Sequence, residues 1–145
     1  AWLQVQACEG GQYPIPTLYY RPMHCYHCAD PPCAAACPTS AITREENGLV
    51  LIDAALCIAC GNCAEACPFS VIAIEPGGAA SKCDGCADQL AAGQRPTCVR
   101  ACPMRALTYG PIDADRPFNR IVDPDFDDGG IGPAVLYWIR APSQI

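Results

Sequence analysis

The chain has 145 residues, 13 of them cysteine, and a formal net charge of −6 at pH 7. Leu, Ile, Val and Phe together number only 28, too few for a self-sufficient aliphatic core, so disulfides, metal ions or inorganic clusters are expected as crosslinks. The acidic charge argues against nucleic-acid binding, and neither a membrane-spanning apolar run nor a signal peptide is predicted.

The predicted secondary-structure elements are short and are separated by turns rich in Gly and Pro. Alternating apolar residues indicate strands, and an Asn-Gly pair between two of them indicates a hairpin. In chain order the expected elements are a strand at 18–20, a hairpin of 41–43 with 49–52 around Asn47-Gly48, a strand at 71–74 ended by Pro76, a helix over 84–92 ended by Gly93, and a strand at 107–109.

Twelve of the thirteen cysteines fall into three quartets, and each quartet ends in the pattern C-x3-C-P. Only Cys8 stands apart. The second quartet reads C-x2-C-x2-C-x3-C-P, which is the ferredoxin pattern for [4Fe–4S] clusters. The quartets are Cys25, Cys28, Cys33 and Cys37; then Cys57, Cys60, Cys63 and Cys67; then Cys83, Cys86, Cys98 and Cys102.

This spacing has a physical reason. Three closely spaced thiolates wrap a loop around three corners of an iron–sulfur cube, and backbone N–H groups then point at its sulfides. The fourth cysteine lies one helical turn further on and reaches a different cluster, after which proline ends the helix. Disulfides, a zinc ribbon and a thioredoxin-like C-x-x-C motif explain the pattern less well, because thirteen is odd and neither motif needs three such quartets.

Together the three quartets resemble the iron–sulfur (electron-transfer) subunits of the complex iron–sulfur molybdoenzyme, or dimethyl sulfoxide reductase, family, which are of the four-cluster ferredoxin type. The similarity covers about residues 8–113 and includes the 44–53 hairpin and the segment from Lys82 to Pro111. It implies an α+β fold with two ferredoxin-like [4Fe–4S] lobes, in which short strands and helices wrap around the clusters, plus an extended C-terminal tail.

The expected domain division follows from the same resemblance. Residues 1–112 form the polycluster domain, with one complete two-cluster lobe at 25–76 and half of a second lobe at 82–112. Residues 113–145 form a tail that docks on partner subunits. The apolar run at 135–139 is either a packed terminal strand or a docking arm in which Trp138 is the buried anchor.

In that family each motif gives three cysteines to one cluster and its fourth to another. This implies a first ligand set of Cys25, Cys28, Cys33 and Cys67, and a second ligand set of Cys57, Cys60, Cys63 and Cys37. Cys83, Cys86 and Cys98 then hold a third cluster whose fourth ligand is missing, and Cys102 serves a cluster completed by a missing N-terminal motif.

The family's most N-terminal quartet has no counterpart upstream of Cys25. Two clusters are therefore expected to be complete within this chain, and three to four in the intact protein. A chain that lacks its first motif explains this better than rewiring of the third quartet through Cys8 does.

The resemblance implies a non-catalytic subunit of an oxidoreductase complex. It relays single electrons between a membrane quinone-linked partner, expected to be a membrane anchor subunit, and a molybdenum- or tungsten-pterin catalytic subunit. Direct membrane insertion is not expected; the protein is membrane-associated through its partners in a prokaryote, on the periplasmic face by co-export or on the cytoplasmic face. The alternatives are a soluble polyferredoxin carrier and a zinc-binding interaction module.

Basic side chains also lie close to the ligands in the sequence. Lys82 precedes Cys83, and its positive charge is expected to raise the potential of a nearby cluster. Arg100 is interpreted as an exposed residue, and His27 as a loop or surface group.

Overall fold

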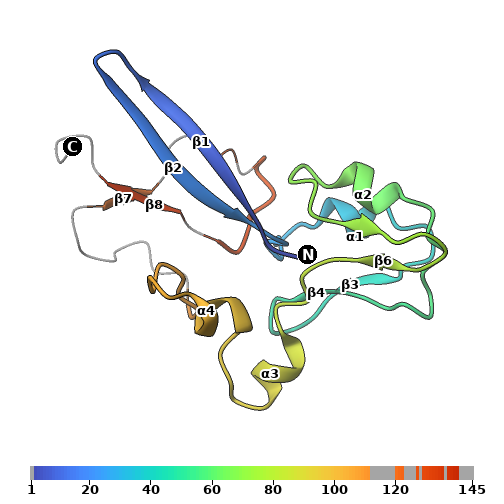
Figure 1. Cartoon of the computed structure of the whole chain (residues 1–145). Coiled ribbons are helices and arrows are strands. Elements are labelled where there is room, and N and C mark those ends of the chain that lie inside the picture. Colours follow the sequence, from blue (N-terminus) through green and yellow to red (C-terminus); the bar gives the residue numbers. More distant parts are fainter. Residues whose placement is uncertain (1, 112–119, 123–126, 128, 136, 141–145) are drawn as a thin grey trace. The chain divides into compact units, whose positions relative to one another are not determined.

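The computed structural model describes residues 2–111, 120–122, 127, 129–135 and 137–140 (Figure 1). Within these ranges the helices have at most five residues, and the strands pair into two-stranded sheets. The elements are β1 (Gln4–Gln12), β2 (Ile15–Met23), α1 (Pro32–Ala35), β3 (Ile42–Arg44), β4 (Val50–Ile52), α2 (Asn62–Ala66), β5 (Ala73–Ile74), β6 (Ala80–Ser81), α3 (Ala87–Ala91), α4 (Thr97–Ala101), β7 (Arg120–Val122) and β8 (Trp138–Arg140).

The predicted hairpin around Asn47-Gly48 is confirmed as β3 and β4. The Asn47 side-chain oxygen accepts the Leu49 N–H at 3.0 Å, and the Glu45 N–H donates to the Leu49 carbonyl at 2.7 Å, which closes the turn. The predicted helix over 84–92 is shorter than expected. It begins only after Cys86, whose left-handed backbone (φ 56°) prevents an earlier helical turn.

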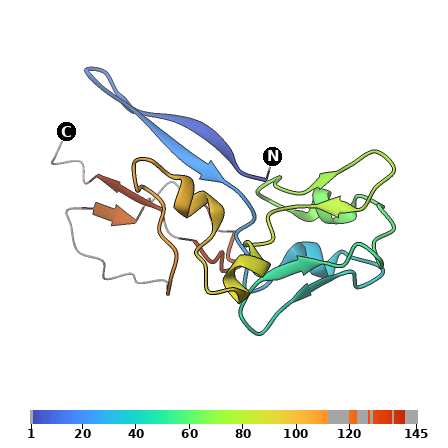
Figure 2. The same ribbon diagram turned by 60° about the horizontal axis from the view of Figure 1, so that its bottom comes forward.

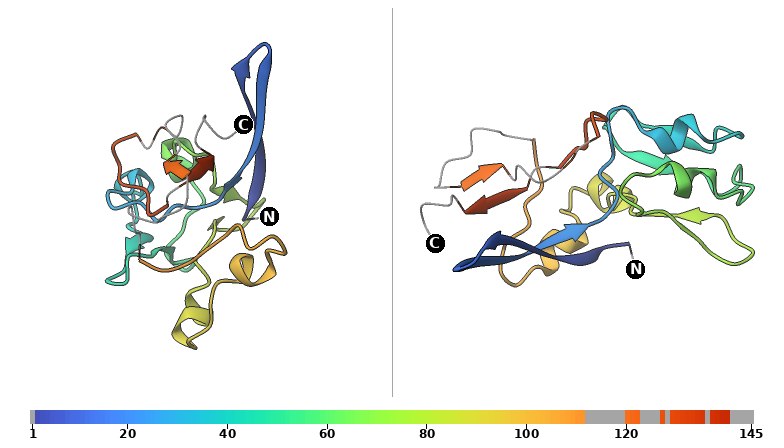
Figure 3. Two further views of the ribbon diagram at one scale, coloured as in Figure 1. Left: turned by 90° about the vertical axis from the view of Figure 1, so that its left-hand side faces the viewer. Right: turned by 90° about the horizontal axis from the view of Figure 1, so that it is seen from above.

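One strand prediction is wrong, and another is confirmed as part of a longer strand. Residues 107–109 are not a strand, because the main chain turns at Arg105 (φ 52°) and the Ala106 N–H donates to the Cys102 sulfur at 3.3 Å instead of to a neighbouring strand. The strand expected at 18–20 is part of the longer β2, which pairs with β1 from Gln4↔Met23 to Gln12↔Ile15 (Figure 3). The sequence of β1 lacks apolar alternation, so no pattern predicted it.

The chain divides into two compact units, each of which is described by itself. Unit 1 comprises residues 1–25, 32–43 and 51–83, and unit 2 comprises residues 26–31, 44–50 and 84–145. In unit 1, α1 lies beside α2, as the views in Figures 1 and 2 both show. Its buried residues include Ala41, Ile42 and Ile72, together with several cysteines. The unit core is therefore shared between aliphatic side chains and sulfur.

In unit 2 the 26–31 loop is joined to the 44–50 turn. His27 Nδ1 accepts the Val50 N–H at 2.9 Å, which requires the neutral imidazole with its proton on Nε2. His27 lies in a loop, as expected, but its side chain is half-buried and is hydrogen-bonded to Val50 in β4. Among the residues whose burial the structure describes, Tyr26 and Val50 are the most deeply buried large side chains, each 1% exposed.

The C-terminal segment of unit 2 is also joined to the 26–31 loop. The Ala29, Asp30 and Ala134 N–H groups form main-chain hydrogen bonds of 2.7–3.2 Å with the carbonyl groups of Gly132, Ile131 and Tyr26, respectively. The hydroxyl groups of Tyr26 and Tyr137 lie 2.8 Å apart, and their rings pack edge to face. Trp138 is in β8, but its side chain lies outside the described part of the chain, as does most of the acidic stretch 123–130.

Gly85 is a point of close packing in unit 2. Its φ is +69°, and a Cβ atom there would lie 2.6 Å from Leu49 Cδ2 and 3.3 Å from His27 Nε2. Only glycine allows the third cysteine motif to approach the first motif and the hairpin so closely.

Replacement of Gly85 by Ala is expected to destabilise the protein more than replacement of Gly93. Both residues have positive φ, which costs an L-residue about 1–2 kcal/mol, but a Cβ atom at Gly93 meets nothing within 4 Å. Crowding of the new Cβ atom at Gly85 adds about 1–3 kcal/mol to the loss of unfolding free energy. Denaturant unfolding followed by circular dichroism measures the difference, and equal losses for Gly85→Ala and Gly93→Ala would contradict this packing.

Candidate metal centre

All three quartets use the same backbone turn between their first two cysteines. The second of the two intervening residues has a left-handed conformation each time, which turns the main chain sharply and brings successive N–H groups to the inside of the loop. These residues are His27 (φ 47°), Ala59 (φ 54°) and Gly85 (φ 69°). The repeat seen in the sequence is therefore a repeat of backbone geometry, although the residue types at this position differ.

A second repeated turn follows the last cysteine of each quartet. The third residue after that cysteine is again left-handed, and its N–H donates to the cysteine carbonyl at 3.1–3.3 Å. The residues are Ser40, Ser70 and Arg105. Because proline immediately follows each of these cysteines, the chain leaves the short helix and turns back past the sulfur.

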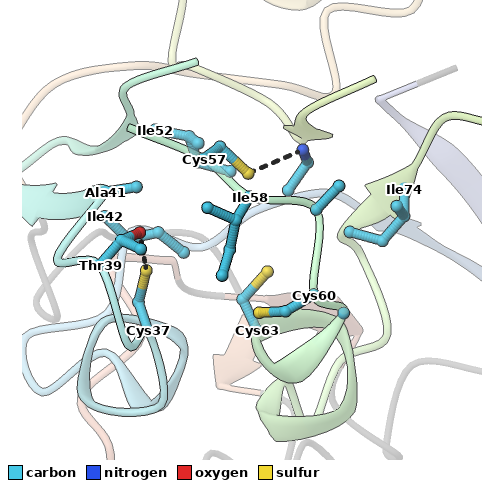
Figure 4. Close-up of a pocket in the computed structure, with 13 residues that line it drawn as sticks. Cys37, Thr39, Ala41, Ile42, Ile52, Cys57, Ile58, Cys60, Cys63 and Ile74 are labelled. Carbon is cyan, nitrogen blue, oxygen red and sulfur yellow. Dashed lines mark hydrogen bonds between the residues drawn. The ribbon is translucent and has the colours of Figure 1, made fainter. Parts of the chain in front are cut away.

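The second ligand set is brought together in unit 1. Cys37, Cys57, Cys60 and Cys63 line one pocket, whose other lining residues are mainly aliphatic (Figure 4). Three of these cysteines belong to the second quartet, and the fourth comes from the first. These four cysteines are the ones that the family resemblance assigns to the second ligand set, and their sharing of one cluster stays a prediction.

Hydrogen bonds support thiolates in this pocket. The pKa of the Cys37 thiol is lowered, first by the Thr39 hydroxyl at 3.7 Å and then by main-chain N–H groups that include those of Ala41 and Ile42. The Cys57 sulfur accepts the Ala80 N–H at 3.3 Å. Main-chain donors at sulfur offset the negative charge of an iron–sulfur cluster.

Burial acts in the opposite direction at Cys63. Its pKa is raised, first by burial and then by the neighbouring thiols of Cys57 and Cys60, which disfavour another negative charge nearby. Cys63 could hold iron as a thiolate, because coordination would replace the thiol proton and offset the negative charge.

Three members of the first ligand set are electrostatically coupled in unit 1. The pKa of Cys33 is raised to about 11, first by burial and then by the Cys25 and Cys67 thiols. Cys28 is separated from Cys25 by only two residues, and it is buried as well. Lys82 acts against these effects, because its positive charge lowers the Cys33 pKa.

The third quartet contributes to unit 2. The Thr97 N–H approaches the Cys86 sulfur at 3.5 Å, which places Cys86 beside the start of α4, where Cys98 lies. The pKa of Cys102 is lowered, first by the Ala106 and Leu107 N–H groups. Main-chain N–H groups thus lower the pKa of Cys102, as they do that of Cys37. Cys8 lies in β1, where it pairs with Tyr19.

The donor set fits a soft, multi-iron cofactor. It consists of thiols surrounded by N–H donors, which is the environment of iron–sulfur clusters. Within the described ranges, no three His, Cys, Asp or Glu side chains converge on a position for a single metal ion; the four sulfurs of the second ligand set instead line the wall of a pocket. No helix among these residues is long and apolar enough to cross a membrane.

Comparison with known families decides the assignment. Residues 16–112 match the family model described as a 4Fe-4S dicluster domain. This protein belongs to the 4Fe-4S dicluster domain family. The cofactor prediction of [4Fe–4S] clusters is thereby confirmed, and the zinc-binding alternative is set aside. The mixed α/β, ferredoxin-like character of this dicluster domain agrees with its short strands and helices.

Several relatives of this dicluster domain are parts of reductases. One chain of the anaerobic dimethyl sulfoxide reductase of Escherichia coli is 46% identical over 96 residues, which cover 66% of this dicluster protein and 47% of the relative. The thiosulfate reductase electron transfer subunit of Salmonella typhi is 43% identical, covering 77% and 59%. The selenate reductase subunit beta of Thauera selenatis is 37% identical, covering 88% and 42%. The dicluster protein spans about half the length of these relatives.

These names confirm the resemblance to iron–sulfur subunits of the molybdoenzyme family, and they agree with the expectation of a non-catalytic, electron-transfer subunit. The structure also adds residues that the sequence did not single out. The Thr39 hydroxyl is hydrogen-bonded to the Cys37 sulfur, and the Ala80 N–H donates to the Cys57 sulfur. The sequence signal for Thr39 was its place directly after the Cys-Pro pair; Ala80 had no such signal.

Removal of the Thr39 hydroxyl is expected to lower the reduction potential of one cluster. Thr39→Val deletes a donor to Cys37, so the reduced, more negative state loses stabilisation. Redox titration followed by electron paramagnetic resonance measures the shift. Thr97→Val is the matched control, because Thr97 contacts Cys86 and should affect a different signal. A shift of the same signal in both variants would refute the assignment.

Proposed function

We propose that this dicluster domain is the electron-transfer part of a reductase complex, relaying single electrons between a membrane quinone-linked partner and a molybdenum- or tungsten-pterin catalytic subunit. The observation that carries the proposal is the pocket of Cys37, Cys57, Cys60 and Cys63, in which two quartets share one site. When bound, a [4Fe–4S] cluster supplies one-electron transfer without proton or group transfer. The names of the relatives support the setting of a reductase complex.

Two complete ligand sets are proposed. The second ligand set is supported by the shared pocket, and the first ligand set by the coupling of Cys33 with Cys25 and Cys67. In each set three cysteines come from one quartet and one from the other. This exchange links two short loops through their cofactors, which compensates for the small number of aliphatic residues.

The third quartet is proposed to serve two further clusters. Cys83, Cys86 and Cys98 would hold three corners of one cluster, and Cys102 one corner of another, with the remaining ligands outside these four residues. Support comes from the N–H donors at the Cys102 sulfur, which reproduce the environment of Cys37. The intact protein would then hold three to four clusters.

The architecture proposed with this function has two ferredoxin-like lobes, at 25–76 and 82–112, and a tail over 113–145 that docks on partner subunits. The protein would be attached to a membrane through those subunits. Within this segment, residues 131–134 form main-chain hydrogen bonds with the 26–31 loop.

Cys60 is the proposed point of electron entry or exit. It is the exposed cysteine of the chain, and the adjacent Leu56 and Ile58 are 51% and 63% exposed. A partner that covers this loop would bring its own redox centre near the second ligand set while excluding water from an apolar surface.

Substitution of Cys60 is expected to interrupt electron flow. Cys60→Ser removes one ligand from the second ligand set, so turnover with the physiological electron donor should fall at least about tenfold, as for other disrupted metal centres. Substrate binding at the partner should persist. Iron content and turnover of the purified complex measure the effect.

Cys8→Ser is the matched control. Cys8 is in β1 and outside both ligand sets, so this variant should keep its iron and its activity. Full turnover in Cys60→Ser would refute the relay, and iron loss in Cys8→Ser would make Cys8 a ligand.

A soluble polyferredoxin carrier is the alternative function. The exposed apolar side chains of β1 and β2, including Val5, Leu18 and Tyr20, favour permanent assembly. Size-exclusion chromatography of native material is expected to show the protein in a larger complex. A lone species of the chain's own mass that exchanges electrons normally would support the carrier instead.

A further inference from the structure

The loop between Cys28 and Cys33 is longer than its counterpart in the second quartet. It contains four residues, Ala-Asp-Pro-Pro, where the second quartet has two. A longer loop has more conformational freedom to lose when two ligands are held at a fixed separation. Proline has no N–H group, so Ala29 and Asp30 carry the only main-chain donors between the two cysteines. The partners of these two donors therefore decide how the loop is held.

Both donors are bound by the C-terminal part of the chain, within unit 2. The first donates to the Gly132 carbonyl at 2.8 Å, and the second to the Ile131 carbonyl at 3.2 Å. In return, the Ala134 N–H donates to the Tyr26 carbonyl at 2.7 Å. As the loop runs forward its partners run backward, which is the order of antiparallel pairing. The loop is therefore held along its main chain by a segment about a hundred residues away in the sequence.

Side chains add two further contacts between the same segments. The hydroxyl groups of Tyr26 and Tyr137 lie 2.8 Å apart, and their rings meet edge to face with centroids 6.1 Å apart. Tyr26 belongs to the first quartet's loop and is only 1% exposed, so this contact reaches into the interior. At Gly132, a Cβ atom would lie 3.1 Å from the Ala29 Cβ atom, so the two main chains approach closely there.

We propose that residues 131–134 and Tyr137, here called the C-terminal strap, position the first quartet's loop so that Cys28 is held ready to bind the cluster of the first ligand set. The proposal rests on the proposed function, which supplies that ligand set. A loop that is already held in place loses less conformational entropy when its cysteine binds, so the cluster is retained longer. The strap residues act through the loop and are positioning residues. Part of the 113–145 tail thus serves its own chain.

The test compares two glycines of the same segment. Gly132→Ala places its new Cβ atom against Ala29, whereas Gly129 has nearly the same φ (+60° against +59°) and a Cβ atom there meets nothing within 4 Å, so Gly129→Ala is the matched control. The full-length protein, purified with its partner chains, is incubated with an iron chelator, and electron paramagnetic resonance follows each cluster signal over time. Gly132→Ala should lose one signal about tenfold faster than the unaltered protein, as for other residues that orient metal ligands.

A second pair of variants changes the side-chain contact alone. Tyr137→Phe removes one hydroxyl oxygen from the strap and should speed the loss of the same signal. Its matched control is Tyr109→Phe, which removes the hydroxyl of a 56% exposed tyrosine outside the strap and should leave every rate unchanged. Cys67→Ser identifies the signal of the first ligand set, and Cys60→Ser that of the second.

The proposal predicts that the signal lost faster in Gly132→Ala and in Tyr137→Phe is the one altered in Cys67→Ser. An unchanged rate in either variant, an equal acceleration in its control, or faster loss of another signal would overturn it. If Gly132→Ala does not fold, the comparison of Tyr137→Phe with Tyr109→Phe decides. Iron and sulfide content of the unaltered protein tests the proposed function separately: absence of clusters rejects that function, whereas equal loss rates with clusters present reject only the strap.

Discussion

The cost of placing ionised thiols in a buried site, close to one another, is the constraint on which this structure depends. At Cys33 burial, and then two nearby thiols, raise the pKa to about 11, so the Cys33 thiol does not ionise readily without metal. Fixed positive and partially positive groups near the sulfurs offset this cost. Main-chain N–H groups point at Cys37, Cys57 and Cys102, and Lys82 lies near Cys33.

This requirement explains why the elements are so short. A left-handed residue between the first two cysteines, and another after the last, turn the chain around each sulfur and direct N–H groups inward. A long helix or strand would use those N–H groups in its own hydrogen bonds. Residues 106–107 illustrate the competition, because their N–H groups support Cys102 and no strand forms there.

The same arrangement accounts for the sparse aliphatic core. In unit 1, residues such as Ala41, Ile42 and Ile72 pack among cysteines, and the proposed clusters would crosslink the loops that these residues only partly enclose. Unit 2 relies on close main-chain approach instead. Gly85 fits against Leu49 and His27, and the 131–134 segment is hydrogen-bonded to the 26–31 loop.

By itself the sequence determined the quartets, the cofactor class and the β3–β4 hairpin, because cysteine spacing and the Asn-Gly turn are local patterns. Only the tertiary structure decided which cysteines of different quartets line one pocket, that β1 pairs with β2, and that Gly85 packs against Leu49 and His27. The physical reason is the sequence separation of the interacting residues. Backbone turns are set by adjacent residues, whereas packing partners depend on which distant segments of the chain come into contact.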